Sequence, residues 1–246
     1  MKLIYLTLLL TLIGCGGENK ESNVESPGSE KTPKTEALET GSAILQDKTP
    51  ISKINMYLDG FHFYNGNMGM QMEAHHYCSK LNEDITQCIM YDGNGEDAKI
   101  MGVEYIVSEK LFMKLPDDEK KMWHSHSYEV KSGELIAPGI PDVAEHALME
   151  EIKSTYGKIF HTWHTDQKLE LPIGIPQLMM GFTKDGQIKD SLVKERDKRL
   201  NVSTEEKRKK REDIAMPNVQ PGANAWEKGE VFQLRMEKNA KKGAHH

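Results

Sequence analysis

Histidine, glutamate and cysteine side chains are concentrated in three short stretches of this 246-residue chain, which has ten histidines and three cysteines. Residues 73–78 read Glu-Ala-His-His-Tyr-Cys, residues 123–129 read Trp-His-Ser-His-Ser-Tyr-Glu, and residues 160–164 read Phe-His-Thr-Trp-His. Imidazole nitrogens bind Zn, Fe, Cu and Ni, and carboxylates complete many such sites. If the three stretches meet in space, they predict a centre for a divalent metal, Zn or Fe.

The spacing of the histidines limits which of them can share one metal. His124 and His126 are two residues apart, so both imidazoles lie on one face if the segment is a strand. His75 and His76 are adjacent and diverge in a strand or a helix, so we expect at most one of them to be a ligand. The full candidate set is His75, His76, Glu104, His124, His126, Glu129 and His161.

The same residues have other ordinary roles. Three protein ligands with an open position would form a catalytic centre that activates water, whereas Cys78 as a fourth ligand would close it. Histidines next to tyrosine or tryptophan also pack in cores with both nitrogens hydrogen bonded. Glu104 lies in the apolar run 100–107, where it either has a buried partner or points to solvent.

Other kinds of activity have less support. The chain contains no Gly-x-Ser-x-Gly elbow and no glycine-rich phosphate loop with its lysine. The formal net charge of −6 argues against nucleic acid as a partner.

The N-terminus resembles the leader of a bacterial lipoprotein. Lys2 precedes the apolar run 3–13, which ends in Leu-Ile and is followed by Gly14 and Cys15. The resemblance implies a signal peptide over residues 1–15 and acyl chains such as palmitate on Cys15. These chains would anchor the protein in a membrane of the bacterial envelope, with the domain facing the periplasm or on the outer membrane. Residues 16–50 are polar and predict a disordered tether, and residues 237–246 predict a flexible tail.

The folded part, residues 51–236, is expected to be a single α+β domain with short antiparallel strands or hairpins and several flanking helices. Ile54, Tyr57, Leu58 and Phe61 have helical spacing. Residues 88–91 and 100–107 predict two strands of a hairpin, and helices are expected after Pro116, after Pro141 and from residue 188 onward.

Cys78 and Cys88 remain after Cys15 is set aside. Their separation in the sequence permits a disulfide in an oxidising compartment, and it is equally consistent with two free buried thiols.

Most of the folded part resembles the oil body-associated protein family. The matching motifs are residues 61–64, 73–78, 82–84, 87–88, 102–106, 115–116, 123–126, 128–133, 155–158, 171–174 and 178–180. Plant members are linked to seed oil bodies, so the resemblance implies a relation to lipid surfaces, but it brings no catalytic residues. Two hypotheses follow: a binding or structural protein at a membrane or lipid interface, with a lipid or small-molecule ligand, and a metal-dependent hydrolase or oxidoreductase.

Overall fold

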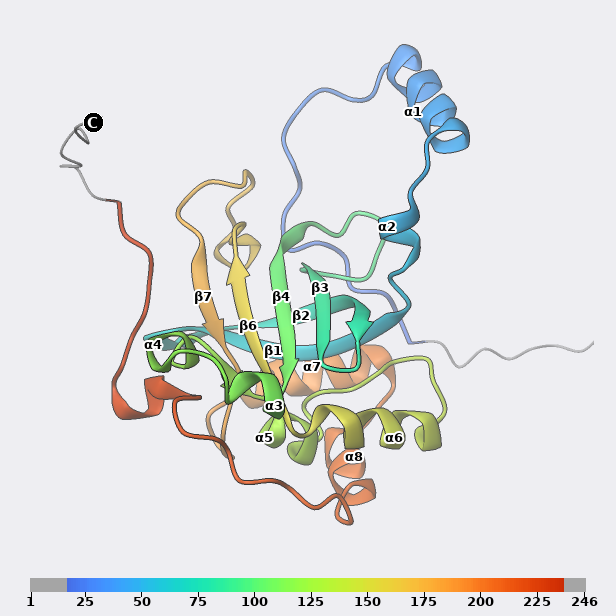
Figure 1. The fold of residues 1–246 in the computed structure, drawn as a ribbon. Helices are drawn as coiled ribbons and strands as arrows, with labels where there is room; N and C mark the ends of the chain where they lie inside the picture. Colours follow the sequence, from blue (N-terminus) through green and yellow to red (C-terminus); the bar gives the residue numbers. More distant parts are fainter. Residues whose placement is uncertain (1–16, 237–246) are drawn as a thin grey trace, which may run out of the picture.

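A computed structural model of the chain describes residues 17–236. Its strands form one antiparallel sheet in the order β4-β3-β2-β1-β7-β6-β5. The strands are β1 (Met56–Tyr64), β2 (Asn67–Asn82), β3 (Ile85–Tyr91), β4 (Ile100–Ser108), β5 (His124–Ser125), β6 (Thr155–His161) and β7 (Gln177–Met180). Because β4 also pairs with β6, every strand except β5 belongs to a closed barrel (Figure 1). The short strand β5 pairs with β6 as an extra strand.

The predicted α+β domain of hairpins and flanking helices is therefore wrong, since the structure is a closed antiparallel β-barrel with a few helices. The expected hairpin corresponds to β3 and β4, but the expected helix around Tyr57 is the strand β1. Leu58 and Phe61 point to opposite faces of β1 and both are buried. A strand buried on both faces lacks alternating polarity, so its apolar spacing resembled that of a helix.

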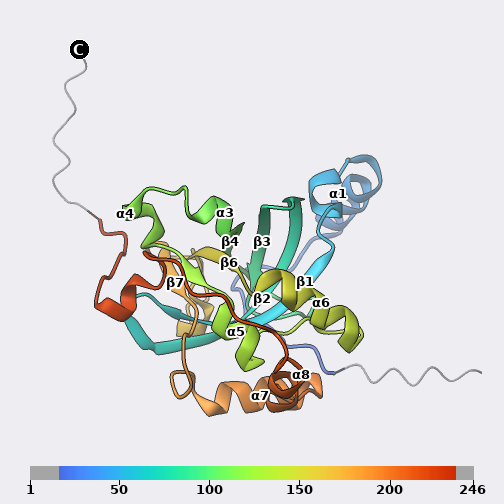
Figure 2. The ribbon, with the colours of Figure 1, turned by 60° about the horizontal axis from the view of Figure 1, so that its bottom comes forward.

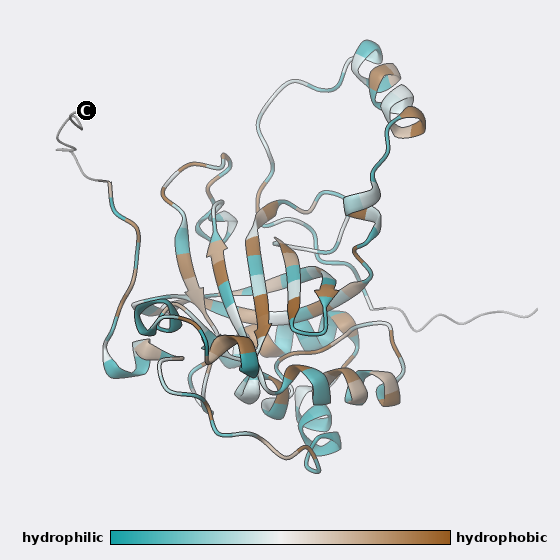
Figure 3. Ribbon diagram, in the orientation of Figure 1, coloured by the Kyte–Doolittle hydropathy of each residue, from teal (hydrophilic) through white to brown (hydrophobic). Residues whose placement is uncertain are grey.

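Short helices cover one end and the sides of the barrel. They are α2 (Thr49–Ser52), α3 (Glu109–Phe112), α4 (Asp117–Lys120), α5 (Ser127–Ser132), α6 (Asp142–Ile152), α7 (Asp190–Leu200) and α8 (Thr204–Lys210), with 3-10 turns η1 (Thr165–Gln167) and η2 (Ala225–Lys228). Figure 2 shows α7 and α8 along one side of the barrel and α3 and α4 along the other. Hydrophobic and hydrophilic residues alternate along several strands (Figure 3).

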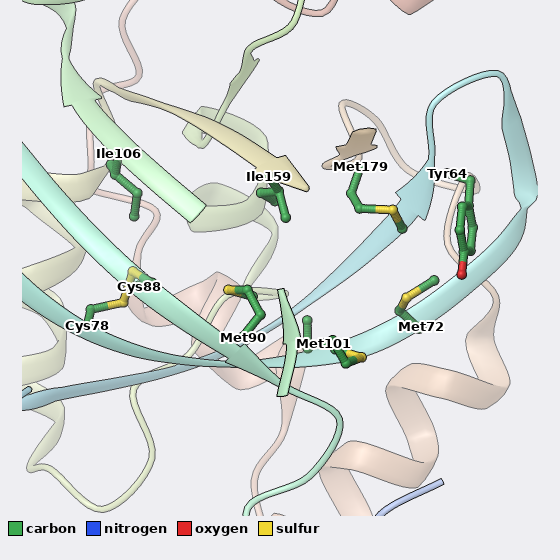
Figure 4. Close-up of a cluster of buried hydrophobic side chains, with 10 residues drawn as sticks. Tyr64, Met72, Cys78, Cys88, Met90, Met101, Ile106, Ile159 and Met179 are labelled. Atoms are coloured by element: carbon green, nitrogen blue, oxygen red, sulfur yellow. A yellow bond between two sulfur atoms is a disulfide. The ribbon is translucent and has the colours of Figure 1, made fainter. Parts of the chain in front are cut away.

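Part of the barrel interior is lined by sulfur-containing side chains (Figure 4). This cluster consists of Tyr64, Met72, Ala74, Cys78, Cys88, Met90, Met101, Ile106, Ile159 and Met179. Cys78 and Cys88 lie opposite each other on β2 and β3, and their sulfur atoms are bonded at 2.00 Å. Flexible methionines fill an irregular interior.

The polar N-terminal segment contacts the barrel in part. The backbone N–H of Glu18 donates to the Arg199 carbonyl at 2.8 Å, and Lys20 Nζ donates to the Asp92 carbonyl at 2.6 Å. The following helix α1 (Pro33–Leu45) has no buried residue and stands apart from the barrel (Figure 1). The segment predicted as a disordered tether thus contains a docked stretch and a helix.

Two predicted segments cannot be compared with the structure. The signal peptide with Cys15 and the tail 237–246 lie outside the described residues. Among residues 17–236, no helix combines the length and the apolar character needed to cross a membrane.

Candidate metal centre

The pairing register places one set of polar side chains inside the barrel. His76 of β2 lies opposite Met90 of β3, Met90 opposite Gly102 of β4, and Gly102 opposite His161 of β6. Residues directly opposite each other project to the same face. The interior polar set is His62, His76, Glu104, His124, His126, Glu129 and His161, each at most 4% exposed.

The protonation of His76 follows from its hydrogen bonds. Its Nδ1 lies 3.0 Å from the Ala74 carbonyl oxygen, which can only accept, so Nδ1 carries the proton. In the neutral ring, Nε2 then has a free lone pair. This Nε2 lies 3.2 Å from Glu104 Oε2 and 3.3 Å from His62 Nε2.

His126 repeats this arrangement on the other side of Glu104. Its Nδ1 lies 2.8 Å from Thr155 Oγ1, and that hydroxyl donates its single proton to the Ile152 carbonyl at 2.8 Å. Thr155 must therefore accept from Nδ1, which leaves a lone pair on Nε2 of the neutral ring. Nε2 lies 3.2 Å from Glu104 Oε1.

Glu104 is thus approached by two imidazole nitrogens that carry no proton in the neutral rings. A lone pair facing a carboxylate oxygen is repulsive in a buried site unless a cation lies between them. The cation is either a proton that makes the imidazole positive or a metal ion. In proteins, a metal-binding histidine usually donates the N–H of its other ring nitrogen to a nearby acceptor, which fixes the orientation of the ring. His76 and His126 both donate Nδ1–H in this way.

Further buried atoms point into the same space without a partner among residues 17–236. Both ring nitrogens of His124 and of His161, Nδ1 of His62 and Oε2 of Glu129 have no hydrogen bond. His124 Nε2 lies 3.8 Å from Glu104 Oε1 and 3.8 Å from Glu129 Oε2. Buried polar atoms normally have partners, so this concentration of unpaired ones marks a site. By contrast, both nitrogens of His164 are hydrogen bonded.

Burial and neighbouring charges set the protonation of the other groups. Burial acts to raise the pKa of Glu104, but the His126 and His76 imidazoles outweigh it and hold that pKa well below its usual range. Burial lowers the pKa of His124 and of His161 to about 3, with neighbouring histidines adding to the effect. Burial, followed by the charge of Glu104, raises the pKa of Glu129 well above its ordinary value. Glu104 is therefore the ionised carboxylate of the centre, and burial disfavours the charged forms of His124 and His161.

Two glycines leave space for this centre. A Cβ on Gly157 would lie 2.1 Å from Glu104 Oε1 and 2.8 Å from His126 Nε2. A Cβ on Gly181 would lie 2.7 Å from Glu129 Oε1. A side chain at either position would fill the space into which Glu104, His126 and Glu129 project.

His75 belongs to a different cluster, on the outer face of the barrel. Its Nδ1 lies 3.2 Å from Asp59 Oδ2, and Asp59 Oδ1 accepts from Arg196 of α7 at 2.9 Å. Glu73 pairs with Arg199 and lies 3.8 Å from Lys20. Asp59, Glu73 and His75 are close enough to hold a cation, but the three basic side chains already balance their charge.

The structure therefore brings together every predicted ligand except His75. The sequence argument omitted His62, which lies 3.3 Å from His76. In a strand, His62 lies on the face opposite Phe61 and Phe63, so a correct assignment of β1 would have placed it inside. His124 and His126 converge although β5 ends at Ser125, and His126 is the N-cap residue directly before α5.

Comparison with known proteins places the chain in a family. A family profile described as protein of unknown function (DUF1264) matches residues 48–215. Oil body-associated protein 1B of Arabidopsis thaliana is 44% identical over 211 residues, which are 85% of this chain and 88% of the relative. Oil body-associated protein 1A of Zea mays is 44% identical over 215 residues, 87% of this chain and 90% of the relative.

The chain belongs to the oil body-associated protein family. Oil body-associated protein 2C of Arabidopsis thaliana is a further member, 38% identical over 212 residues, 85% of this chain and 90% of the relative. No solved structure matches the chain.

The family assignment corrects the predicted location. These relatives are plant proteins whose names refer to oil bodies, which points away from the envelope of a bacterium. The prediction of a bacterial membrane-anchored lipoprotein is therefore wrong. It depended on residues 1–15, which lie outside the described part of the chain.

Proposed function

We propose that this oil body-associated family member binds a divalent transition metal inside its barrel. The observation that supports this proposal is the pair of imidazoles, His76 and His126, whose Nδ1 protons are already donated and whose Nε2 atoms converge on Glu104. Neutral imidazole and carboxylate donors suit zinc and iron. Because the polar set is at most 4% exposed, the centre is closed to large substrates, so we propose metal binding rather than hydrolysis or oxidation.

The distances between donor atoms agree with tetrahedral coordination. At a metal–ligand distance of about 2.0–2.1 Å, two corners of a tetrahedron are about 3.3–3.4 Å apart. The His76 Nε2–Glu104 Oε2, His126 Nε2–Glu104 Oε1 and His76 Nε2–His62 Nε2 distances are 3.2, 3.2 and 3.3 Å. Little movement is needed to place an ion between the two donor atoms of any one of these pairs.

The test is the metal content of the full, tag-free chain, measured by mass spectrometry after gel filtration and after reconstitution with zinc or iron(II). We expect bound metal in stoichiometric amount and its loss in the double variant His76→Asn, His126→Asn. His146→Asn is the matched control, because His146 is an accessible histidine paired with Asp213, outside the barrel. A folded chain that takes up neither ion would overturn the proposal.

A second candidate function is association with a phospholipid-coated oil surface. It is supported by the names of the relatives and by an apolar hollow of about 380 Å³ on the outer face of β2 and β3, lined in part by Ile51, Ile54, Tyr77 and Ile89. Ile51 is 60% exposed and the adjacent Val103 is 42% exposed, so apolar surface is available to a lipid layer.

The lipid proposal is tested by flotation with triolein droplets coated with phosphatidylcholine. We expect the wild-type chain to float and the Ile51→Glu, Val103→Glu double variant to remain in solution. Val143→Glu, at an exposed position on α6, is the control. Equal flotation of all three proteins, or of none, would contradict the proposed surface.

A further inference from the structure

Glu104 takes part in two separate groups of potential ligands. One group is His62, His76 and Glu104, and the other is Glu104, His124 and His126. Within each group the donor atoms lie within 4.8 Å of one another, and every residue of both groups is buried. Resting on the proposed metal binding, we infer that the barrel holds a dinuclear centre in which Glu104 bridges two metal ions.

The two oxygens of Glu104 face different histidines. Oε2 lies 3.2 Å from His76 Nε2, whereas Oε1 lies 3.2 Å from His126 Nε2 and 3.8 Å from His124 Nε2. A single ion could not bind all these nitrogens at about 2.0–2.1 Å, because His76 and His126 approach opposite oxygens of the carboxylate. Two ions bound to opposite oxygens of one carboxylate would have the spacing of about 3.5–4 Å seen in two-metal sites.

Each half has donors beyond Glu104. His62 Nε2, 3.3 Å from His76 Nε2, adds a second nitrogen to the first ion. His161 lies next to His62, with ring centroids 5.7 Å apart, and both of its nitrogens lack a partner among residues 17–236. On the other side, Glu129 Oε2 lies 3.8 Å from His124 Nε2 and supplies a second carboxylate.

The number of unpaired donor atoms supports two ions rather than one. The interior polar set holds five histidines and two carboxylates, Glu104 and Glu129, all of them buried. Both ring nitrogens of His124 and of His161, and Oε2 of Glu129, have no hydrogen-bond partner among residues 17–236. Five histidines around one ion would leave several buried nitrogens unpaired, at a cost that a second ion removes.

The test is the zinc stoichiometry of the full chain. Chelator-treated protein is titrated with zinc chloride, and zinc per chain is measured by mass spectrometry after gel filtration. We expect two zinc ions per chain for the wild type, one for His62→Asn, one for His124→Asn and none for the double variant. His146→Asn, and separately a His245→Ala, His246→Ala variant, control for zinc on other histidines.

The outcomes separate this inference from the proposal on which it rests. One zinc per wild-type chain, lost completely in either single variant, would overturn the dinuclear centre and leave metal binding intact. No zinc in the wild-type chain would overturn both. A readout independent of variants comes from cobalt(II): the electron paramagnetic resonance signal of the first equivalent should change when the second is added. Simple addition of two unaltered signals would contradict a shared bridge.

Discussion

Gly157 tests the account of the centre without altering any ligand. It lies in β6 opposite Ile106 of β4 and His124 of β5, so its backbone is held on both sides. In Gly157→Ala, the new Cβ would lie 2.1 Å from Glu104 Oε1 and 2.8 Å from His126 Nε2. Contacts below 3.0 Å do not occur for real Cβ atoms, so Glu104 must move by roughly 1 Å.

Such a movement exceeds what the metal centre tolerates. Ligand distances in metal sites hold to within about 0.2 Å, so a displacement several times larger should abolish binding. Crowding a packed interior by one methyl group also costs about 1–3 kcal/mol without metal. A metal present at a free concentration of 100 times its Kd stabilises the native wild type by about 2.7 kcal/mol, and the variant would lose this as well.

The assay is urea denaturation of both proteins with excess zinc and with chelator, together with zinc content. We expect chelation to destabilise the wild type by about 3 kcal/mol for each bound ion and Gly157→Ala by less than about 0.5 kcal/mol. Gly41→Ala is the control, since no atom lies within 4 Å of its Cβ position in α1. It should retain zinc and the full response to chelator.

If Gly157→Ala folds and still binds zinc as the wild type does, the space beside Glu104 is not the metal site.

Other predictions concern the rest of the fold. Burial raises the pKa of Glu134 from 4.5 to about 7, so the native state favours the neutral acid. The stability that the neutral acid contributes is fully present below pH 4.5 and is lost as the pH rises through 7. Glu134→Gln should therefore match the wild type near pH 4 and exceed it by about 3 kcal/mol at pH 8 in urea denaturation, and equal stability at both pH values would contradict this. Arg196→Met should destabilise the fold by about 3–5 kcal/mol because it leaves Asp59 buried without its 2.9 Å ion pair, and a loss below 1 kcal/mol would show that the pair is dispensable. Replacing Cys78 and Cys88 with serine opens a bridge across a sequence separation of 10 and should cost about 3 kcal/mol, measured by thermal unfolding against the oxidised wild type, with unchanged stability as the contrary result.

Parts of the fold were predictable because their signals are local. The β3–β4 hairpin has two apolar runs around a glycine-rich turn, and α6 begins directly after Pro141. Barrel closure was not predictable in this way. It depends on β1 pairing with β7 and β4 pairing with β6, between segments far apart in the sequence. No local pattern encodes such contacts. In addition, β1 is buried on both faces, and the spacing of its apolar residues resembles that of a helix.

The sequence predicts the centre only as far as residue type, and the alternation of side chains along a strand, determine which way each side chain points. The sequence identified the right stretches, and adjacency alone implied that His75 and His76 face different ways. It did not indicate which of them faces inward, since that choice depends on the register of β2 against β1 and β3. His62 was omitted because its segment was taken for a helix. The role of Gly157 is visible only when the neighbouring strands are in place.

The most direct test of the central claim is anomalous X-ray scattering from crystals of the full chain loaded with zinc, with data collected on both sides of the zinc absorption edge. Two peaks are expected inside the barrel, one between Glu104 Oε2 and His76 and the other between Glu104 Oε1 and His126. Peaks confined to histidines outside the barrel, or an interior without any peak, would contradict the claim.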